Sequence, residues 1–314
     1  MDSGIFSRTV VRPEIMKQPM FSKEKFPDFE KISVEIGFGN GENPVHLAVE
    51  EPDTLVVGIE LSFSCIMKLL KKTSRLGLNN VRVLKGDARF ILRECFDDGV
   101  IDGLFMNFPC PWPKKRHIKR RVTNSDFMDT VASVLKTGAF FEVVTDEYWY
   151  AQAIRDSVAG NKVLSVDSLE ENPGRKIRTK YERKWLEEGK NIYLVSIRKK
   201  SEHNIERIIQ GAEKEMHCKL PGSEILAKDL KQMKGSGSSE GAVHFVFRNT
   251  YTDTEERNIF LLECISTDEE FEQKFYFKVV NDPGGAMIKL DATTPVFRTP
   301  AVKKALQFLC ESLG

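Results

Sequence analysis

Near its start the chain reads Val34-Glu35-Ile36-Gly37-Phe38-Gly39-Asn40-Gly41, a β-branched run that passes into three alternating glycines. Glycines that follow a first strand let the backbone approach a ligand closely, with the N-terminus of a helix behind them. The spacing is GxGxG, whereas nicotinamide-binding domains carry GxGxxG. Because such loops also occur as plain tight turns, the interpretation depends on the sequence around this one.

Short β-branched runs alternate with helical periods from residue 30 to residue 200. Strands that alternate with helices predict a parallel sheet with right-handed crossovers, which is a doubly wound α/β domain. Only a polar loop separates the last two runs, so we expect them to close the sheet as an antiparallel pair. Seven strands in this pattern favour a methyltransferase sheet over a six-stranded dinucleotide fold. The predicted strands are Ile32–Ile36, Leu55–Ile59, Val81–Leu84, Gly103–Asn107, Ala139–Val144, Lys162–Leu169 and Asn191–Ile197.

Two helices between these strands are indicated by apolar side chains at i, i+3, i+4 and i+7 spacing. We expect the first to begin after a Ser62 cap and to end before Gly77, and the second to end before Gly138. The apolar positions are Phe63, Ile66, Met67 and Leu70 in the first helix, and Phe127, Val131, Val134 and Leu135 in the second.

Three carboxylates accompany the first three strands. Glu60 lies 19 residues past Gly41, where a carboxylate would reach a ribose diol. Asp87, in Lys85-Gly86-Asp87-Ala88, would accept the exocyclic amine of an adenine. Glu35 lies inside the strand before the glycines, and its charge suits the amino group and sulfonium of S-adenosylmethionine better than a pyrophosphate. Each alone is explained as a strand-end charge, but together they predict an adenine nucleoside and favour methyl transfer over hydride transfer.

The sequence after residue 200 predicts a separate α+β module, so we expect domains at residues 1–200 and 201–314. A helical stripe comes first, followed by a Gly/Ser-rich stretch, Lys234–Gly241, that we expect to be a flexible loop. Four runs then predict an antiparallel meander before a final helix. The stripe comprises Ile205, Ile208, Ile209, Ala212 and Met216; the runs are Val243–Phe247, Ile259–Ile265, Gln273–Val280 and Ala286–Leu290; the final helix carries Val302, Ala305, Leu306, Leu309, Cys310 and Leu313.

Charge is unevenly distributed along the chain, although its formal net charge is only +1. Residues 1–200 carry a net charge of +5 and residues 201–314 a net charge of −4. The positive charge is concentrated in Lys114–Arg121 and Gly174–Lys184, each of which holds six Lys or Arg. Such clustering points to a polyanionic partner.

The overall composition, 41% hydrophobic and 30% charged, is that of a soluble globular protein. No apolar run approaches the roughly 18 residues that a membrane span needs, and the N-terminus lacks the apolar stretch of a signal peptide. The cysteines stand far apart without a CxxC, which argues against a disulfide framework or a zinc site and favours a reducing cytosol. They are Cys65, Cys95, Cys110, Cys218, Cys264 and Cys310.

Residues 107–117 read Asn-Phe-Pro-Cys-Pro-Trp-Pro-Lys-Lys-Arg-His. Three prolines stiffen a loop at the carboxyl end of a central strand, next to the expected cofactor, and a basic run follows directly. In an alternative interpretation Trp112 packs in the core, and the basic run is a solvated face or a localisation signal. A rigid loop and a basic run that meet at the functional edge of the sheet favour a site.

Residues 30–199 resemble the bacterial tRNA (guanine-N7-)-methyltransferase family. The matching stretches are Glu35–Glu42, Gly58–Glu60, Lys85–Ala88, Asn107–Arg121, Thr145–Asp146 and Thr179–Glu182. The resemblance implies a class I, Rossmann-like methyltransferase fold with a seven-stranded sheet. It also implies methyl transfer from S-adenosylmethionine to N7 of the guanosine at position 46, in the tRNA variable loop.

Residue roles follow from the same resemblance. Cofactor binding is implied for Glu35, Gly37, Gly39, Glu60, Asp87, Ala88 and Asn107. Substrate binding is implied for Lys114, Lys115, Arg116, Asp146, Thr179, Lys180, Tyr181 and Glu182, and the catalytic positions are Cys110 and Asp146. Tyr181 or Trp112 would stack on a flipped base, with core packing as the alternative. We expect tRNA as the partner, and neither a metal nor a membrane.

Cys110 departs from the family pattern, which has an aspartate at this position. A thiol is a much weaker hydrogen-bond acceptor than a carboxylate. Guanine N7 carries an in-plane lone pair and needs no deprotonation, so alignment of the reactants supplies much of the catalysis. Asp146 and Glu182 remain as carboxylates to stabilise the developing cation. We therefore expect activity that is reduced rather than abolished.

The sequence thus predicts a cytoplasmic tRNA (guanine-N7-)-methyltransferase. The alternatives are a non-catalytic protein that binds tRNA and the cofactor, a methyltransferase of another RNA, and a nicotinamide oxidoreductase. The GxGxG spacing and Glu35 disfavour the last. For the acidic C-terminal module we expect a stabilising role or the formation of a homodimer.

Overall fold

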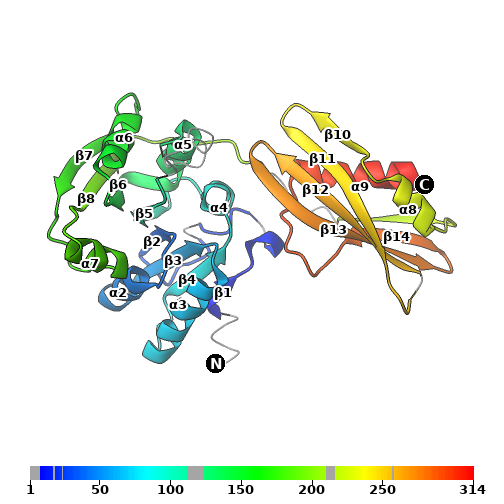
Figure 1. Cartoon of the computed structure of the whole chain (residues 1–314), viewed down its shortest axis with the longest axis horizontal. Coiled ribbons are helices and arrows are strands. Elements are labelled where there is room, and N and C mark those ends of the chain that lie inside the picture. The colour runs from blue at the N-terminus through cyan, green and yellow to red at the C-terminus, as the bar shows by residue number, and fades with distance from the viewer. Residues whose placement is uncertain (1–7, 17, 23, 112–122, 210–215, 257) are drawn as a thin grey trace. The chain divides into compact units, whose positions relative to one another are not determined.

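The computed structural model describes residues 8–16, 18–22, 24–111, 123–209, 216–256 and 258–314. The chain divides into two compact units (Figure 1). The first comprises Met1–Arg12 and Pro19–Glu206, and the second comprises Pro13–Gln18 and Arg207–Gly314. The domain boundary expected after residue 200 stays a prediction. No helix in the described ranges is long and apolar enough to span a membrane.

The first unit is built on one eight-stranded sheet with the order β1-β4-β3-β2-β5-β6-β8-β7. Neighbours from β1 through β6 pair in parallel, and β8 pairs antiparallel with both β6 and β7. All seven predicted strands are present, and a two-residue strand, β1, extends one edge. The strands are β1 (Val10–Val11), β2 (Lys31–Ile36), β3 (Thr54–Glu60), β4 (Val81–Lys85), β5 (Ile101–Asn107), β6 (Leu135–Thr145), β7 (Leu164–Glu171) and β8 (Tyr193–Lys199).

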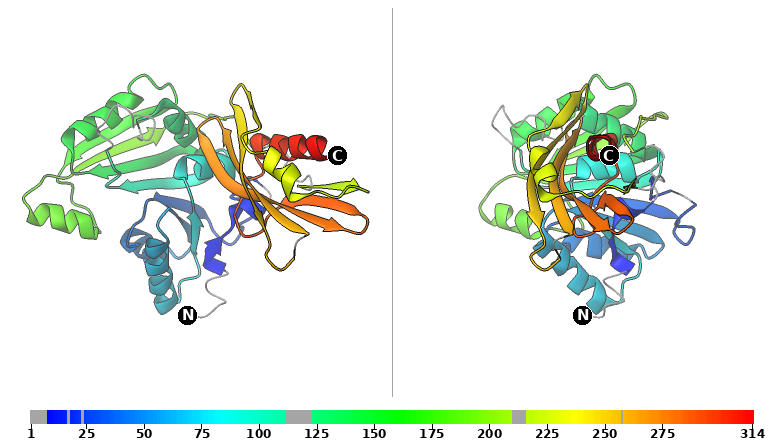
Figure 2. Two further views of the ribbon diagram at one scale, coloured as in Figure 1. Left: turned by 45° about the vertical axis from the view of Figure 1, so that its right-hand side comes forward. Right: turned by 90° about the vertical axis from the view of Figure 1, so that its right-hand side faces the viewer.

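Helices flank this sheet, and α2 contacts α3 while α4 contacts α5 and α5 contacts α6 (Figures 1 and 2). The α3 boundaries follow the prediction: Ser62 caps its first turn by accepting the Cys65 amide hydrogen, and Gly77 ends it with φ 65°. The helices are α2 (Glu42–Glu50), α3 (Phe63–Leu76), α4 (Ala88–Cys95), α5 (Ser125–Val134), α6 (Tyr148–Val158) and α7 (Lys180–Glu187). A short 3-10 turn, Pro13–Ile15, belongs to the second unit.

Two expectations for the first unit were wrong. The helix predicted to include Leu135 ends at Val134, and Leu135 is already the first residue of β6. The connection between β7 and β8 was expected to be only a polar loop, yet it contains α7. The helix was missed because α7 buries a single residue, the carboxylate Glu182. It therefore lacks the apolar stripe by which a helix is recognised in a sequence.

The second unit is a six-stranded antiparallel sheet with the order β10-β11-β12-β13-β14-β9, and α9 lies against one of its faces (Figure 2). The predicted meander and final helix are confirmed. Its apolar core includes Phe247, Phe277 and Leu309, all fully buried. The elements are β9 (His217–Pro221), α8 (Ala227–Gln232), β10 (Gly237–Glu240), β11 (Val243–Thr252), β12 (Ile259–Asp268), β13 (Phe271–Asp282), β14 (Gly285–Leu290) and α9 (Pro300–Leu313).

Three expectations for the region after residue 200 need correction. Residues 205–209 are not helical, and residues 210–215 of the predicted stripe lie outside the described ranges. Part of the Gly/Ser-rich stretch, expected to be a flexible loop, forms β10, because backbone pairing with β11 satisfies its polar groups without needing apolar side chains. Cys218 of β9 and Cys310 of α9 form a disulfide, whereas the wide spacing of the cysteines had argued against disulfides; the two lie 92 residues apart in sequence and meet only in the fold.

Candidate active site

A cavity of about 620 Å³ opens at the carboxyl-terminal edge of the first unit's sheet. Its walls come from residues directly after β2, β5 and β6, from Glu60 at the end of β3, and from the start of α7. Sites in open α/β sheets lie at this edge, where the strand order reverses. Here β2 is the central strand from which the order runs outward to β3 on one side and β5 on the other.

The glycine loop forms one wall of this cavity. Gly37 and Gly39 have φ of 67° and 53°, a left-handed conformation that side chains other than glycine rarely adopt. Glu60 fixes the loop from β3, because its Oε2 accepts the Gly39 amide hydrogen at 3.1 Å while its Oε1 accepts those of Leu61 and Ser62. The Glu60 carboxylate is therefore oriented by backbone donors at the cavity edge.

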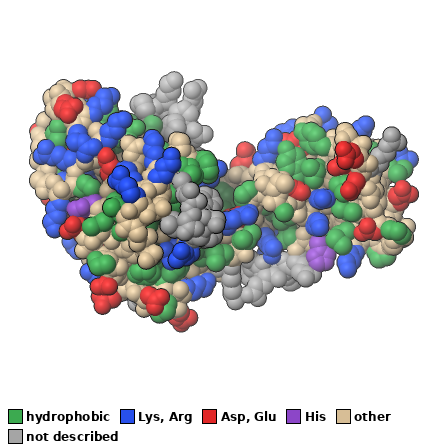
Figure 3. All heavy atoms as spheres, turned by 90° about the horizontal axis from the view of Figure 1, so that it is seen from below, with side chains coloured by type: hydrophobic (Ala, Val, Ile, Leu, Met, Phe, Trp, Pro, Cys, Tyr) green, Lys and Arg blue, Asp and Glu red, His purple; other side chains and the backbone are tan. Residues whose placement is uncertain are grey.

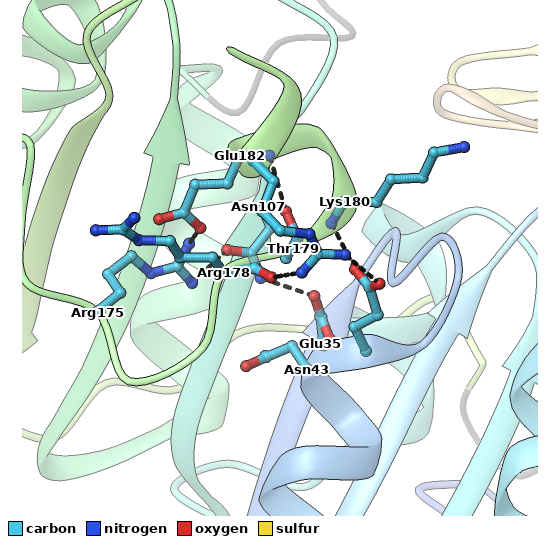
Figure 4. A network of polar contacts seen from close by, with 10 residues as sticks. Glu35, Asn43, Asn107, Arg175, Arg178, Thr179, Lys180 and Glu182 are labelled. Atoms are coloured by element: carbon cyan, nitrogen blue, oxygen red, sulfur yellow. Dashed lines mark hydrogen bonds and ion pairs between the residues drawn. The ribbon is translucent and has the colours of Figure 1, made fainter. Parts of the chain in front are cut away.

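Glu35 is buried at the base of the cavity, and both of its carboxylate oxygens accept amide hydrogens (Figure 4). The Asn107 amide donates at 2.7 Å and the Asn43 amide at 3.3 Å. Burial raises the pKa of Glu35 to about 7, although the two amides and the positive charge of Arg175 act in the opposite direction. Because this pKa is close to neutral pH, a cation that binds beside Glu35 would favour the charged carboxylate.

A polar chain connects Glu35 to α7 (Figure 4). Asn107 receives a hydrogen bond from Arg175 at 2.7 Å, and the same guanidinium forms an ion pair with Glu182, also at 2.7 Å. The side chains of Arg175 and Glu182 are 11% and 2% exposed, so this pair is shielded from solvent screening. Side-chain hydrogen bonds and an ion pair therefore link Glu35 to the helix that follows Thr179.

The N-terminus of α7 is fixed in two further ways. Thr179 is the N-cap and accepts the amide hydrogen of Glu182. Glu42, at the start of α2, accepts the Lys180 amide hydrogen at 2.5 Å and pairs with Arg183 at 2.9 Å. Tyr181 lines the cavity with 55% of its surface exposed, so its ring remains available for stacking.

The loop after β5 contributes Phe108, Pro109, Cys110 and Pro111 to the cavity. Phe108 has φ 53°, a conformation that costs a non-glycine residue about 1–3 kcal/mol and is concentrated at functional sites. Its amide donates to the Val144 carbonyl at 2.7 Å, which ties the strained turn to β6. Cys110 follows two residues later and is exposed.

Asp146 follows β6 and lines the same cavity. Its Oδ2 lies 3.0 Å from the Lys190 ammonium, which in turn stands over the Trp185 ring at 3.6 Å from the centroid. The ion pair and the cation–π contact orient Asp146 without burying it completely.

The structure brings most of the predicted site residues together. The cavity lining includes the predicted residues Glu35, Gly37, Gly39, Glu60, Asn107, Cys110, Asp146, Thr179, Lys180 and Tyr181. Asp87 and Ala88 do not line it: Asp87 is the N-cap of α4, and its carboxylate binds the Arg89 guanidinium. Glu182 is held behind the lining by Arg175. Trp112, Lys114, Lys115 and Arg116 lie outside the described residues, and their roles stay predictions.

Sequence reasoning missed four polar residues that shape the site: Asn43, Glu42, Arg175 and Lys190. Arg175 belongs to the basic cluster Gly174–Lys184, from which a polyanionic partner was predicted, and the charge of an arginine does not show whether it forms a buried ion pair or stays exposed. Asn43 had a usable signal, since it stands at the second position of the helix that follows the glycine loop. No metal-type group of three His, Cys, Asp or Glu occurs within the described ranges.

The groups at this cavity suit S-adenosylmethionine. The glycine loop allows close backbone approach, Glu60 presents a carboxylate for a ribose diol, and Glu35 offers the negative charge that an ammonium requires. The cavity volume is within the range of small-molecule sites.

Comparison with known proteins places this arrangement in a family. The model of a family described as "Putative methyltransferase" matches residues 30–195. A tRNA (guanine-N(7)-)-methyltransferase of Thermotoga maritima is 40% identical, over 94% of this chain and 93% of the relative. One of Aquifex aeolicus is 31% identical, over 91% and 95%. Among solved structures, the 16S rRNA methyltransferase KamB aligns with TM-score 0.46 and 16% identity, over 62% of this chain and 99% of that one. The chain belongs to the tRNA (guanine-N7-)-methyltransferase family of S-adenosylmethionine-dependent enzymes.

Proposed function

We propose that this protein transfers a methyl group from S-adenosylmethionine to N7 of the guanosine at position 46 in the variable loop of tRNA. One observation carries the proposal: the glycine loop, Glu35 and the start of α7 line the same cavity. A cofactor bound by the first two would present its reactive group toward residues that can hold a base. The names of the two relatives support the choice of tRNA and of guanine N7.

S-adenosylmethionine supplies an electrophilic methyl group on a sulfonium when it is bound. Glu35 would hold its ammonium, and Glu60 would hold its ribose hydroxyls. N7 of guanine attacks with an in-plane lone pair, so the protein needs no general base and must chiefly align the reactants. Positive charge develops on the base, and the Asp146 carboxylate at the cavity wall would stabilise it. Lys190 keeps that carboxylate oriented.

The start of α7 would receive the target base. Thr179, Lys180 and Tyr181 line the same cavity as Glu35, and the half-exposed Tyr181 ring offers a stacking surface. Glu182 acts mainly through Arg175, with which it is buried. The basic residues Lys114, Lys115 and Arg116 are proposed as further phosphate contacts.

The position of Cys110 supports one alternative, a protein that binds tRNA and the cofactor without catalysis. Its exposed thiol lies in the cavity wall at a position where the family carries an aspartate. Since alignment rather than proton transfer dominates the reaction, we favour a slowed enzyme over an inactive one. A cytoplasmic location accords with a tRNA substrate, and a homodimer formed by the second unit stays a prediction that analytical ultracentrifugation tests.

The decisive experiment is transfer of labelled methyl groups to unmodified tRNA by the natural sequence, Cys110→Asp and Cys110→Ser. Borohydride–aniline cleavage would locate 7-methylguanosine. We expect label at the variable-loop guanosine with all three proteins, and a single-turnover rate about tenfold higher for Cys110→Asp. Label with Cys110→Asp alone would establish the binding-only alternative. Absence of label in every protein, despite binding of S-adenosylmethionine, would contradict tRNA as the substrate.

A further inference from the structure

A second, smaller cavity of about 310 Å³ lies beside the one described above, and four of its eight lining residues are Lys or Arg. We call it the basic pocket, and its residues are Glu42, Val45, Lys72, Arg75, Leu76, Ile177, Arg178 and Arg183. They come from the start of α2, the last turns of α3, the segment before Thr179 and α7. Figure 3 shows several Lys and Arg side chains on the visible face of the first unit.

Two of the four cations are already engaged. Arg183 pairs with Glu42 at 2.9 Å, and the Lys72 ammonium donates to the Asn40 carbonyl at 2.8 Å. Among the described residues, the side chains of Arg75 and Arg178 form no ion pair, and both are exposed. They face the same pocket from α3 and from the segment before α7, which are about a hundred residues apart in the chain. Only one carboxylate, Glu42, balances the four cations.

The basic pocket is continuous with the active-site wall. Glu42 lines both cavities, and Asn40, which Lys72 holds, lines the larger one. Ile177 and Arg178 directly precede Thr179, the N-cap of α7 and part of the larger cavity. A group bound in the basic pocket and a base bound in the active site could therefore belong to the same nucleic-acid strand.

We propose that the basic pocket binds a backbone phosphate of the RNA strand next to the guanosine that is methylated, with Arg75 and Arg178 as its principal ligands. Arginine forks match phosphate oxygens in pairs. Val45, Leu76 and Ile177 add apolar lining, which suits the sugar of a nucleotide better than a free inorganic anion. This proposal rests on the proposed function, because it assumes that the strand carries the target base.

The test compares Arg75→Gln and Arg178→Gln with two controls that remove one positive charge elsewhere. Lys71→Gln lies on α3 outside the pocket lining, and Arg155→Gln removes an exposed arginine of α6 that pairs only with its neighbour Asp156. The measurements are tRNA affinity at several salt concentrations, KM and kcat for methylation, affinity for S-adenosylmethionine, and melting temperature.

We expect each pocket variant to raise the Kd and KM for tRNA about fivefold and to lower the slope of log K against log salt by about one. Affinity for S-adenosylmethionine and melting temperature should equal those of the natural sequence, and the controls should change tRNA affinity less than twofold. Ethylation interference should locate the contact: ethylation of one phosphate near the target guanosine should weaken binding of the natural sequence but not of Arg75→Gln.

Pocket variants that behave like the controls would overturn the proposal. An ethylation-interference pattern that is the same for the pocket variants and the natural sequence would also overturn it. So would inorganic phosphate that weakens tRNA binding more than another salt of equal ionic strength does, if it does so equally in the natural sequence and in the pocket variants. The proposed function fails separately: if the natural sequence binds tRNA without labelling guanine N7, the binding and interference measurements still decide on the pocket.

Discussion

At the scale of single residues, the raised pKa of Glu35 makes the stability of the fold depend on pH. Its pKa is raised to about 7 by burial, so between pH 4.5 and 7 the native carboxyl keeps a proton that the unfolded chain has released. The contribution of Glu35 to the unfolding free energy is therefore complete below about pH 4.5 and is lost as pH rises through about 7. The shift corresponds to roughly 3 kcal/mol.

Glu35→Gln should remove this dependence. Without cofactor, the unfolding free energy of the natural sequence should fall relative to the variant by up to about 3 kcal/mol between pH 5 and pH 8, in paired urea titrations. Calorimetry should also show S-adenosylmethionine binding to the natural sequence strengthen from pH 6 to pH 7.5, because its ammonium favours the charged carboxylate. Parallel pH profiles for both proteins would contradict the assignment.

The sequence predicted which residues line the cavity better than it predicted the contacts that each of them makes. Glu35, Glu60 and Asn107 could be placed because each stands at or near a strand end, where the topology of a parallel sheet brings residues together. Asp87 stands at such an end too, yet it is the N-cap of α4 and binds Arg89. The link from Arg175 to Asn107 spans 68 residues and depends on side-chain direction, which no local pattern encodes.

At the scale of elements, α7 depends on its polar anchors. An eight-residue helix that buries only Glu182 has little intrinsic stability in water. Its fixed position therefore depends on the Arg175–Glu182 pair, the Thr179 cap and Glu42. The same dependence explains why apolar spacing could predict α3, with its ends given by Ser62 and Gly77, but could not predict α7.

Arg175→Gln should loosen α7, because it leaves the Glu182 carboxylate buried and unpaired, at a cost of about 3–5 kcal/mol that local opening relieves. We expect hydrogen exchange of residues 180–187 to accelerate at least 100-fold while that of β2 and β5 stays unchanged, and KM for tRNA to rise. Lys184→Gln is the matched control, since its ion pair with Glu188 lies on the same helix and both side chains are exposed. The double variant Arg175→Gln/Glu182→Gln should recover most of the protection, and a double variant as mobile as the single one would refute the buried-pair explanation.

At the scale of the whole molecule, the chain combines two separately built cores. The first unit follows from strand–helix alternation and most of the second from a meander of consecutive strands, both of which the sequence reveals. The pairing of β9 with β14 and the disulfide instead join segments that are distant in sequence. The Gly/Ser-rich β10 is a strand only because β11 offers it hydrogen-bond partners. The bond between Cys218 and Cys310 closes a separation of 92 residues, which spacing alone could not anticipate. Long-range pairing is the part of the fold that local pattern leaves open.

That disulfide yields the prediction at this scale. A cross-link over 92 residues restricts the unfolded chain and should stabilise the second unit by roughly 4 kcal/mol. In the oxidised protein, Cys218→Ser/Cys310→Ser should lower the calorimetric transition of the second unit, while methyl transfer at 25 °C and the transition of the first unit, which contains the proposed active site, stay unchanged. Reductant should reproduce the shift in the natural sequence and leave the double variant unaffected. A shift of both transitions together would mean that the two units unfold as one, and equal stability with and without reductant would mean that the bond contributes nothing.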